Sequence, residues 1–177
     1  MTILKNIRRS APYELLQADS FRAEFGVVLE ERPQAPGVCG DYRITSTSEA
    51  TLPLEKAVGH SLLGHKVEFK NDKTSVDYKS FWVEYATLNK GVVKESGHVK
   101  AAREGCLVVI TSGLAAPGRE VYVFTGASLL NMVANHTRYK LKTKPGANGN
   151  PPGFFSLGKV VFLGDAKNCV DFRYTMS

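Results

Sequence analysis

The segment from Cys106 to Thr111 is an unbroken run of apolar and β-branched residues, and it limits what this chain can fold into more than any other feature. A strand that is apolar along its whole length has to be covered on both faces, as the central strands of α/β sheets are. With 177 residues the chain is long enough for one domain with a substantial core and short for two. We therefore expect residues 1–177 to form a single mixed α/β domain around a central mixed sheet flanked by helices.

Further periodic patterns place helices and strands around this segment. Apolar residues near a 3.6-residue period predict a helix over 12–31, with Ser10 before Pro12 as its start signal. Alternating or β-branched stretches predict strands. The expected core spans about 10–111 and the C-terminal strands and helix about 119–164, with strands over 41–47, around Glu68, over 80–88, 120–125, 138–142 and a last one over 159–163, and helices over 52–59, 96–104 and 127–135.

The stretch Val67-Glu68-Phe69-Lys70 places an acid and a lysine two residues apart on one of these strands. Side chains alternate along a strand, so Glu68 and Lys70 share a face while Phe69 points into the core. An isolated aspartate, Asp41, precedes them. Two carboxylates can hold a divalent cation, and a lysine beside them can position a water or offset developing charge, as metal-assisted phosphodiester cleavage requires. From spacing alone, an ordinary cross-strand surface pair is the commoner explanation of Glu68 and Lys70.

Two further blocks follow this stretch in a defined order. After 67–72 comes the aromatic strand segment Phe81-Trp82-Val83-Glu84-Tyr85, and then the turn and helix start Glu95-Ser96-Gly97-His98. Together with the order helix, Asp strand, Glu-x-Lys strand, strand, helix, strand, the region from about Gly40 to Thr111 resembles the PD-(D/E)xK nuclease superfamily. The resemblance is closest to small nucleases of this type from phages and bacterial genomes, and it implies a restriction-endonuclease-like core.

The resemblance also implies roles for individual residues. Asp41 and Glu68 are expected to bind Mg²⁺ or Mn²⁺, with the carbonyl of Phe69 as a further ligand, because these ions prefer oxygen ligands and water. Lys70 is expected beside the attacking water. Glu84 is expected on a neighbouring strand, within reach of the same pocket as an additional ligand, a water-mediated ligand or a residue that orients Lys70. A place on a solvated face of its strand explains Glu84 about equally well.

The start of the helix over 96–104 offers candidate phosphate contacts. Ser96 and the amides of Gly97 and His98 could bind a phosphate, and Lys100 could neutralise the nucleic-acid backbone. Ser96 is also a plain helix N-cap candidate, which is the simpler interpretation. The side chain of His98 has no visible partner for a catalytic triad, and we expect it on the surface.

A second basic feature is the run from Arg138 to Lys144, in which Arg138, Lys140 and Lys142 share one face of the expected strand. Such a face could follow a nucleic-acid backbone. Lysines that protect an edge strand against aggregation explain the run equally well. The chain has 23 Lys and Arg against 17 Asp and Glu, and its net charge of +6 favours DNA as an anionic partner.

These observations predict a metal-dependent DNA endonuclease or junction-resolvase-like enzyme. A nucleic-acid-binding protein that kept the fold and lost cleavage is the main alternative, and a binding domain with a coincidental Glu-x-Lys is a third. A homodimer would suit paired cuts. The three cysteines, Cys39, Cys106 and Cys169, lack metal-ligand or disulfide spacing, and Cys106 is expected to be a buried thiol.

The first residues contain no apolar signal segment, and no apolar run approaches the ~20 residues of a membrane helix. The sequence therefore predicts a cytoplasmic protein without a membrane partner, in a bacterial cell or a phage-infected host.

Overall fold

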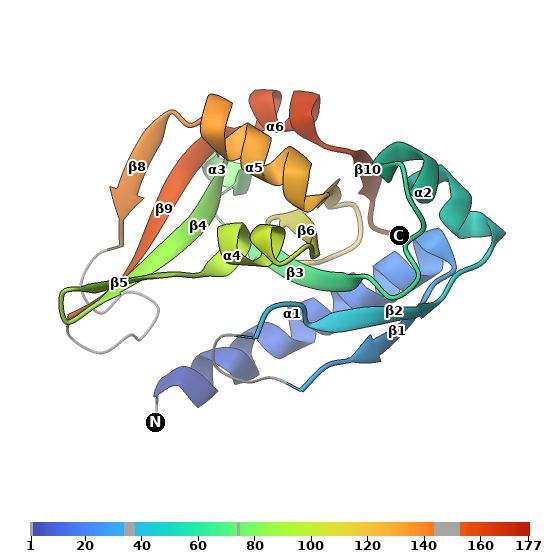
Figure 1. Cartoon of the computed structure of the whole chain (residues 1–177), viewed down its shortest axis with the longest axis horizontal. Helices are drawn as coiled ribbons and strands as arrows, with labels where there is room; N and C mark the ends of the chain where they lie inside the picture. The colour runs from blue at the N-terminus through green and yellow to red at the C-terminus, as the bar shows by residue number, and fades with distance from the viewer. Residues whose placement is uncertain (1, 34–37, 74, 144–152) are drawn as a thin grey trace.

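The computed structural model describes residues 2–33, 38–73, 75–143 and 153–177 and arranges them in two β-sheets with helices around them (Figure 1). Sheet A has six strands, in the order β1 (Val28–Glu31), β2 (Tyr42–Ser46), β3 (Lys66–Asp72), β6 (Leu107–Ser112), β7 (Glu120–Phe124) and β10 (Phe172–Thr175). Sheet B has four, in the order β5 (Val92–Glu95), β4 (Ser80–Asn89), β9 (Phe154–Phe162) and β8 (Tyr139–Lys142). The predicted mixed α/β class is confirmed.

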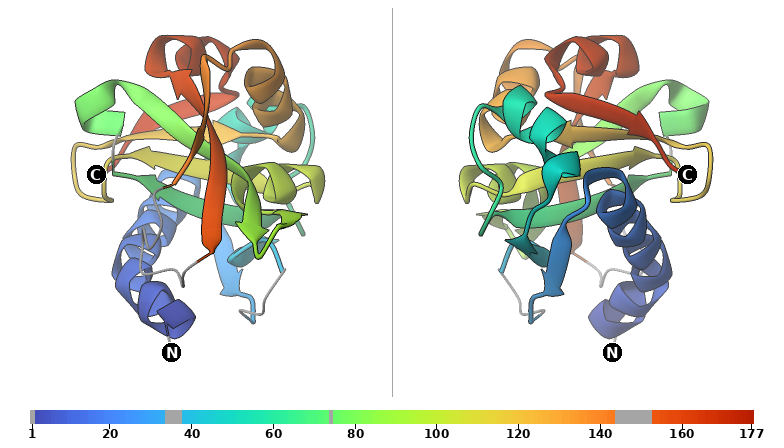
Figure 2. Two further views of the ribbon diagram at one scale, coloured as in Figure 1. Left: turned by 90° about the vertical axis from the view of Figure 1, so that its left-hand side faces the viewer. Right: turned by 90° about the vertical axis from the view of Figure 1, so that its right-hand side faces the viewer.

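The helices lie on both faces of sheet A. The long α1 (Thr2–Phe25) and the short α2 (Leu52–Val58) lie on one face, and α4 (Gly97–Arg103), α5 (Gly126–Asn135) and α6 (Leu163–Cys169) lie on the other side (Figures 1 and 2). The single-turn helices η1 (Glu49–Thr51) and α3 (Ser75–Tyr78) belong to connections. Within the described residues, no helix combines the length and apolar character needed to cross a membrane.

Strand β6 lies inside sheet A and is buried at every position, as its apolar sequence predicts. It runs parallel to β3 and antiparallel to β7. Leu107 and Val109 pack into the core that α1 covers, whereas Val108 and Ile110 pack into the core formed with α4 and α5. Cys106, just before the strand, is a buried free thiol as expected. One core lies on each face of sheet A, so alternate side chains of the adjacent β3 point toward one core or the other.

Aromatic packing holds β3 against α1. The ring of Phe69 is 1 % exposed and lies edge-on to Phe21 of α1, at 5.8 Å between ring centroids, and to Tyr42 of β2, at 5.6 Å. Burial of such rings stabilises by about 1.5–3 kcal/mol each. Because Phe69 points toward α1, its neighbours Glu68 and Lys70 must point to the opposite face of sheet A.

The predicted N-terminal helix has the wrong boundaries. It begins at Thr2, contains Pro12 in its interior and ends at Phe25, where Gly26 adopts a left-handed φ of +59°. The next residues form β1 instead of helix: Leu29 is 6 % exposed and Val28 is 56 % exposed. Over so short a stretch, this pattern of apolar residues fits both the 3.6-residue period of a helix and the two-residue period of a strand. The pairing with β2 selects the strand.

The C-terminal region also differs from expectation. The predicted last strand over 159–163 is the end of the longer β9, and α6 and β10 follow it. Strand β10 returns to sheet A beside β7, and β5 forms a hairpin with β4. Which strands pair is decided by contacts between distant parts of the chain, and the local sequence pattern does not predict them. The Pro, Gly and Asn residues of 144–152 predict a loop, and this segment lies outside the described residues.

Candidate functional site

Asp41 and Glu68 are brought together by the pairing of β2 with β3. These strands are antiparallel, with Tyr42 opposite Val67 and Arg43 opposite Lys66. Continuing this register by one residue places Asp41 opposite Glu68. The long segment between the strands is taken up by η1 and α2, which do not disturb the pairing. The upstream aspartate therefore lies next to the Glu-x-Lys strand, as the sequence predicts.

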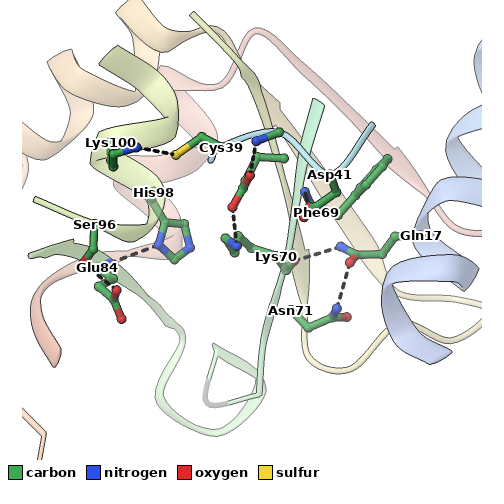
Figure 3. Close-up of polar contacts among 12 residues, drawn as sticks. Gln17, Cys39, Asp41, Phe69, Lys70, Asn71, Glu84, Ser96, His98 and Lys100 are labelled. Carbon is green, nitrogen blue, oxygen red and sulfur yellow. Dashed lines mark hydrogen bonds and ion pairs between the residues drawn. The ribbon is translucent and has the colours of Figure 1, made fainter. Parts of the chain in front are cut away.

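Each of the two carboxylates binds the backbone beside the other. Asp41 Oδ2 accepts a hydrogen bond from the Phe69 N–H at 2.7 Å, and Glu68 Oε2 accepts one from the Gly40 N–H at 2.6 Å (Figure 3). Hydrogen bonds to ionised carboxylates are stronger than neutral ones. This reciprocal arrangement fixes both carboxylates and places Asp41 beside the backbone of Phe69, whose carbonyl is the expected further ligand.

Lys70 pairs directly with Glu68. Its Nζ lies 2.5 Å from Glu68 Oε1, and the two side chains are 30 % and 10 % exposed. Burial alone would lower the pKa of Lys70, but the charges of Glu68 and Asp41 outweigh that effect and raise its pKa above the ordinary value. The lysine is therefore held in its charged form beside the two carboxylates.

The carboxyl group of Asp41 has a raised pKa. Burial raises the pKa of Asp41 to about 6, the ammonium of Lys70 opposes this shift, and the charges of Glu68 and Glu14 add to it. Glu14 comes from α1 and is half-buried. In the sequence, Glu14 indicates only the start of a helix, together with Ser10 and Pro12. Glu14 lies three residues before Gln17 on the same face of α1, and only the structure shows that this face meets the site.

Gln17 connects α1 to the strand that carries the site. Its side chain is 1 % exposed, and its Nε2 lies 2.8 Å from the Lys70 carbonyl and 2.6 Å from Thr111 Oγ1. Its Oε1 accepts a hydrogen bond from Asn71 Nδ2 at 2.7 Å (Figure 3). Nothing in the sequence singled out this glutamine, because one polar residue on a helix has no periodic signal.

Glu84 does not lie on a strand next to β3, and that prediction was wrong. Its strand, β4, belongs to sheet B, while β2 and β6 flank β3. Glu84 Oε1 accepts a hydrogen bond from Ser96 Oγ at 2.8 Å, and Ser96 makes no side-chain cap bond to α4. Gly97 has φ +60°, and a Cβ there would lie 2.7 Å from Glu84 Cβ. Ser96 and Gly97 therefore accommodate the Glu84 side chain at the start of α4.

His98 is buried, so its expected surface position was wrong. The side chain is 8 % exposed, and its Nδ1 lies 3.1 Å from the Glu84 backbone nitrogen, from which it accepts a hydrogen bond. Burial and the charge of Lys70 lower the pKa of His98 to about 3. The His98 ring lies between Glu84 of sheet B and the Lys70 side chain (Figure 3), and so it connects sheet B to the Glu68–Lys70 pair.

The candidate phosphate-binding cations that the structure describes already have protein partners. Lys100 Nζ lies 2.5 Å from Glu104 Oε1 at the C-cap of α4, and it donates to Cys39 Sγ at 3.6 Å, next to Gly40 (Figure 3). Arg138 pairs with Asp165 of α6 at 3.0 Å and lies over the Phe162 ring. The structure thus directs Arg138 toward α6. The remaining two candidates are in β8, and their side chains lie outside the described part of the chain: Lys140 and Lys142.

The donor set suits a hard, largely hydrated cation. Over the described ranges, no group of three or more His, Cys, Asp or Glu side chains is arranged to hold a metal ion. Mg²⁺, however, is commonly bound through one or two carboxylates, with water completing its shell. Asp41 and Glu68 provide such a pair. Burial and, to a lesser extent, the charges of Glu68 and Glu14 raise the pKa of Asp41, and a bound cation would favour its ionised form. The residues fit Mg²⁺ or Mn²⁺.

Comparisons of the chain with protein-family models, with curated proteins and with solved structures found no match.

The titration of Asp41 gives a prediction for the metal-free protein. Its folded pKa of about 6 lies above the ordinary value of about 3.9, so the folded state binds more protons between these pH values. This contribution to stability is present below about pH 4 and is lost as the pH rises to about 6. We expect Asp41→Asn to be more stable than wild type at pH 7, by about 1–3 kcal/mol, and to lack this pH dependence.

Urea unfolding in chelator between pH 4 and 7.5 measures the effect. The same substitution at Asp77, an exposed aspartate in α3, is the matched control and should follow the wild-type profile. Parallel wild-type and Asp41→Asn profiles would contradict the prediction.

Proposed function

We propose that this protein is a divalent-metal-dependent DNA nuclease that hydrolyses phosphodiester bonds as an endonuclease or junction-resolvase-like enzyme. The observation that carries the proposal is the convergence of Asp41, Glu68 and Lys70 where β2 meets β3, with the lysine held charged 2.5 Å from Glu68. Two acceptor-only carboxylates beside an ammonium are the groups that metal-assisted phosphodiester hydrolysis uses.

Each residue of the site has a distinct role in this hydrolysis. Asp41, Glu68 and the Phe69 carbonyl hold Mg²⁺ or Mn²⁺, which when bound supplies Lewis-acid polarisation of the phosphate. The Lys70 ammonium offsets the charge that develops on the phosphate oxygens and positions the attacking water. The backbone bonds from Gly40 and Phe69 keep both carboxylates oriented before substrate arrives. Gln17 fixes the Lys70 carbonyl and so the strand beneath the ammonium.

The order of elements supports placing the protein in the PD-(D/E)xK superfamily. Helix α1, β2 beside Asp41, β3 with Glu68 and Lys70, then β4, α4 and β6 follow the expected order. The net charge of +6 favours DNA as the partner. A cytoplasmic location, in a bacterial cell or a phage-infected host, and a homodimer suited to paired cuts are parts of the same proposal.

A cleavage assay tests the proposal. Supercoiled, linear, single-stranded and branched DNA are each incubated with the purified protein in Mg²⁺, in Mn²⁺ and in chelator. We expect metal-dependent cleavage that Glu68→Gln lowers by at least about 10²–10³-fold. Glu49→Gln, at an exposed glutamate in η1, is the matched control and should cleave like wild type.

Other results would point elsewhere. Salt-sensitive DNA binding without cleavage of any substrate would favour a nucleic-acid-binding protein that lost catalysis. Absence of both binding and cleavage would refute the proposed function.

A further inference from the structure

The hydrogen bond from Glu84 fixes the protonation state of His98. A backbone N–H can only donate, so His98 Nδ1, 3.1 Å from the Glu84 nitrogen, must present its lone pair. A doubly protonated ring would point a second hydrogen at the Glu84 N–H. The ring is therefore the neutral tautomer, and its single proton resides on Nε2.

The Nε2 donor of His98 lies beside the candidate site. The ring lies between the Glu84 backbone and the Lys70 side chain (Figure 3), and it is 8 % exposed. Burial and the Lys70 charge lower the pKa of His98 to about 3, so the ring stays neutral near physiological pH. Among the described residues, no hydrogen bond to Nε2 is found.

Two donors thus adjoin the same space, the Nε2–H of His98 and the ammonium of Lys70. The fully buried polar side-chain atoms without a partner among the described residues do not include His98 Nε2, so this donor is not enclosed by protein and a bound group can reach it. An anion with several acceptor oxygens would satisfy both, and a phosphate diester has two non-bridging oxygens.

We propose that His98 is a phosphate-binding residue of the site, whose Nε2–H donates to a non-bridging oxygen of the scissile phosphate diester beside Lys70. This inference rests on the proposed function, because it places the reacting phosphate next to the Glu68–Lys70 pair. His98 adds a hydrogen bond without adding charge. Its backbone partner Glu84, in turn held by Ser96, aims the ring from sheet B.

Two isosteric substitutions separate this role from a structural one. In His98→Asn, the amide oxygen can take the place of Nδ1 and accept from Glu84, but the distal donor is gone. In His98→Gln, the amide nitrogen can take the place of Nε2, but the acceptor for Glu84 is gone. Single-turnover cleavage at saturating DNA with Mg²⁺ and the melting temperature are measured for both.

We expect His98→Asn to keep a near-native melting temperature and to cleave about 10²-fold more slowly, as when one transition-state donor is lost. His98→Gln should restore part of the rate despite a lower melting temperature. Wild-type cleavage by His98→Asn would overturn the inference, and so would equal losses in the two variants with only His98→Gln destabilised.

A measurement without catalysis keeps the inference separate from the proposed function. Proton–nitrogen NMR of the ¹⁵N-histidine-labelled protein should show the proton of His98 on Nε2, and this signal should shift when a single-stranded oligonucleotide is added in chelator. A shift in a protein that cleaves no DNA would support His98 while refuting the nuclease. A proton on Nδ1, or an unmoved signal despite oligonucleotide binding, would overturn the inference. Failure to bind any oligonucleotide would overturn both.

Discussion

Replacing Lys70 by methionine is expected to lower metal-dependent cleavage by about 10²–10³-fold while maintaining or raising the affinity for Mn²⁺. The ammonium pairs with Glu68 and opposes the raised pKa of Asp41. Without it, the two carboxylates repel each other, and a divalent cation becomes the charge that relieves them. Cleavage falls because nothing then offsets the charge that develops on the phosphate.

Calorimetric titration with Mn²⁺ and single-turnover cleavage test the two halves of this expectation. Lys56→Met, at an exposed lysine of α2, is the matched control and should change neither. Glu68→Gln should weaken both binding and cleavage, since it removes a ligand. Loss of Mn²⁺ binding in Lys70→Met would contradict the assigned role, and so would unchanged cleavage.

The second large effect is expected at Gln17, away from the reacting groups. Gln17→Leu keeps a similar volume but leaves the Thr111 hydroxyl, the Lys70 carbonyl and the Asn71 amide without their bonds to Gln17. Each buried group left unsatisfied costs about 1–3 kcal/mol. Allowing for partial relaxation, we expect the free energy of unfolding to fall by about 3–4 kcal/mol.

Urea denaturation measures this loss as a lower midpoint at an unchanged slope. Glu24→Leu, at an exposed position of α1, is the control for adding leucine to this helix and should change stability by about 0.5 kcal/mol or less. A Gln17→Leu midpoint equal to that of wild type would show that the buried network contributes nothing net.

The sequence was informative wherever the signal is local. The apolar run after Cys106 predicted the buried central strand, and the alternation through Glu68, Phe69 and Lys70 predicted the face of each side chain. Strand alternation follows from backbone geometry, and it is visible without any knowledge of the partner strand. Asp41 was named from its order in the chain, and it lies opposite Glu68 when the register of β2 with β3 is continued by one residue.

Single polar residues gave no comparable signal. Glu14, Gln17 and His98 lie on helices. The periodic pattern of a helix marks its apolar positions and does not show which polar side chains are buried. A buried polar side chain takes its role from the group that it meets, and that group comes from a distant part of the chain. His98 could therefore be identified only once β4 and α4 were seen side by side.

The sequence by itself determined the mixed α/β class, the central strand and the shared face of Glu68 and Lys70. These properties follow from residue periodicity, which each element expresses alone. Only the tertiary structure decided that β4 joins a second sheet, that β10 forms the edge of the first, and that the His98 ring faces Lys70. Those outcomes depend on contacts between elements far apart in sequence, where the energy of burial and pairing is gained only after the chain has closed on itself.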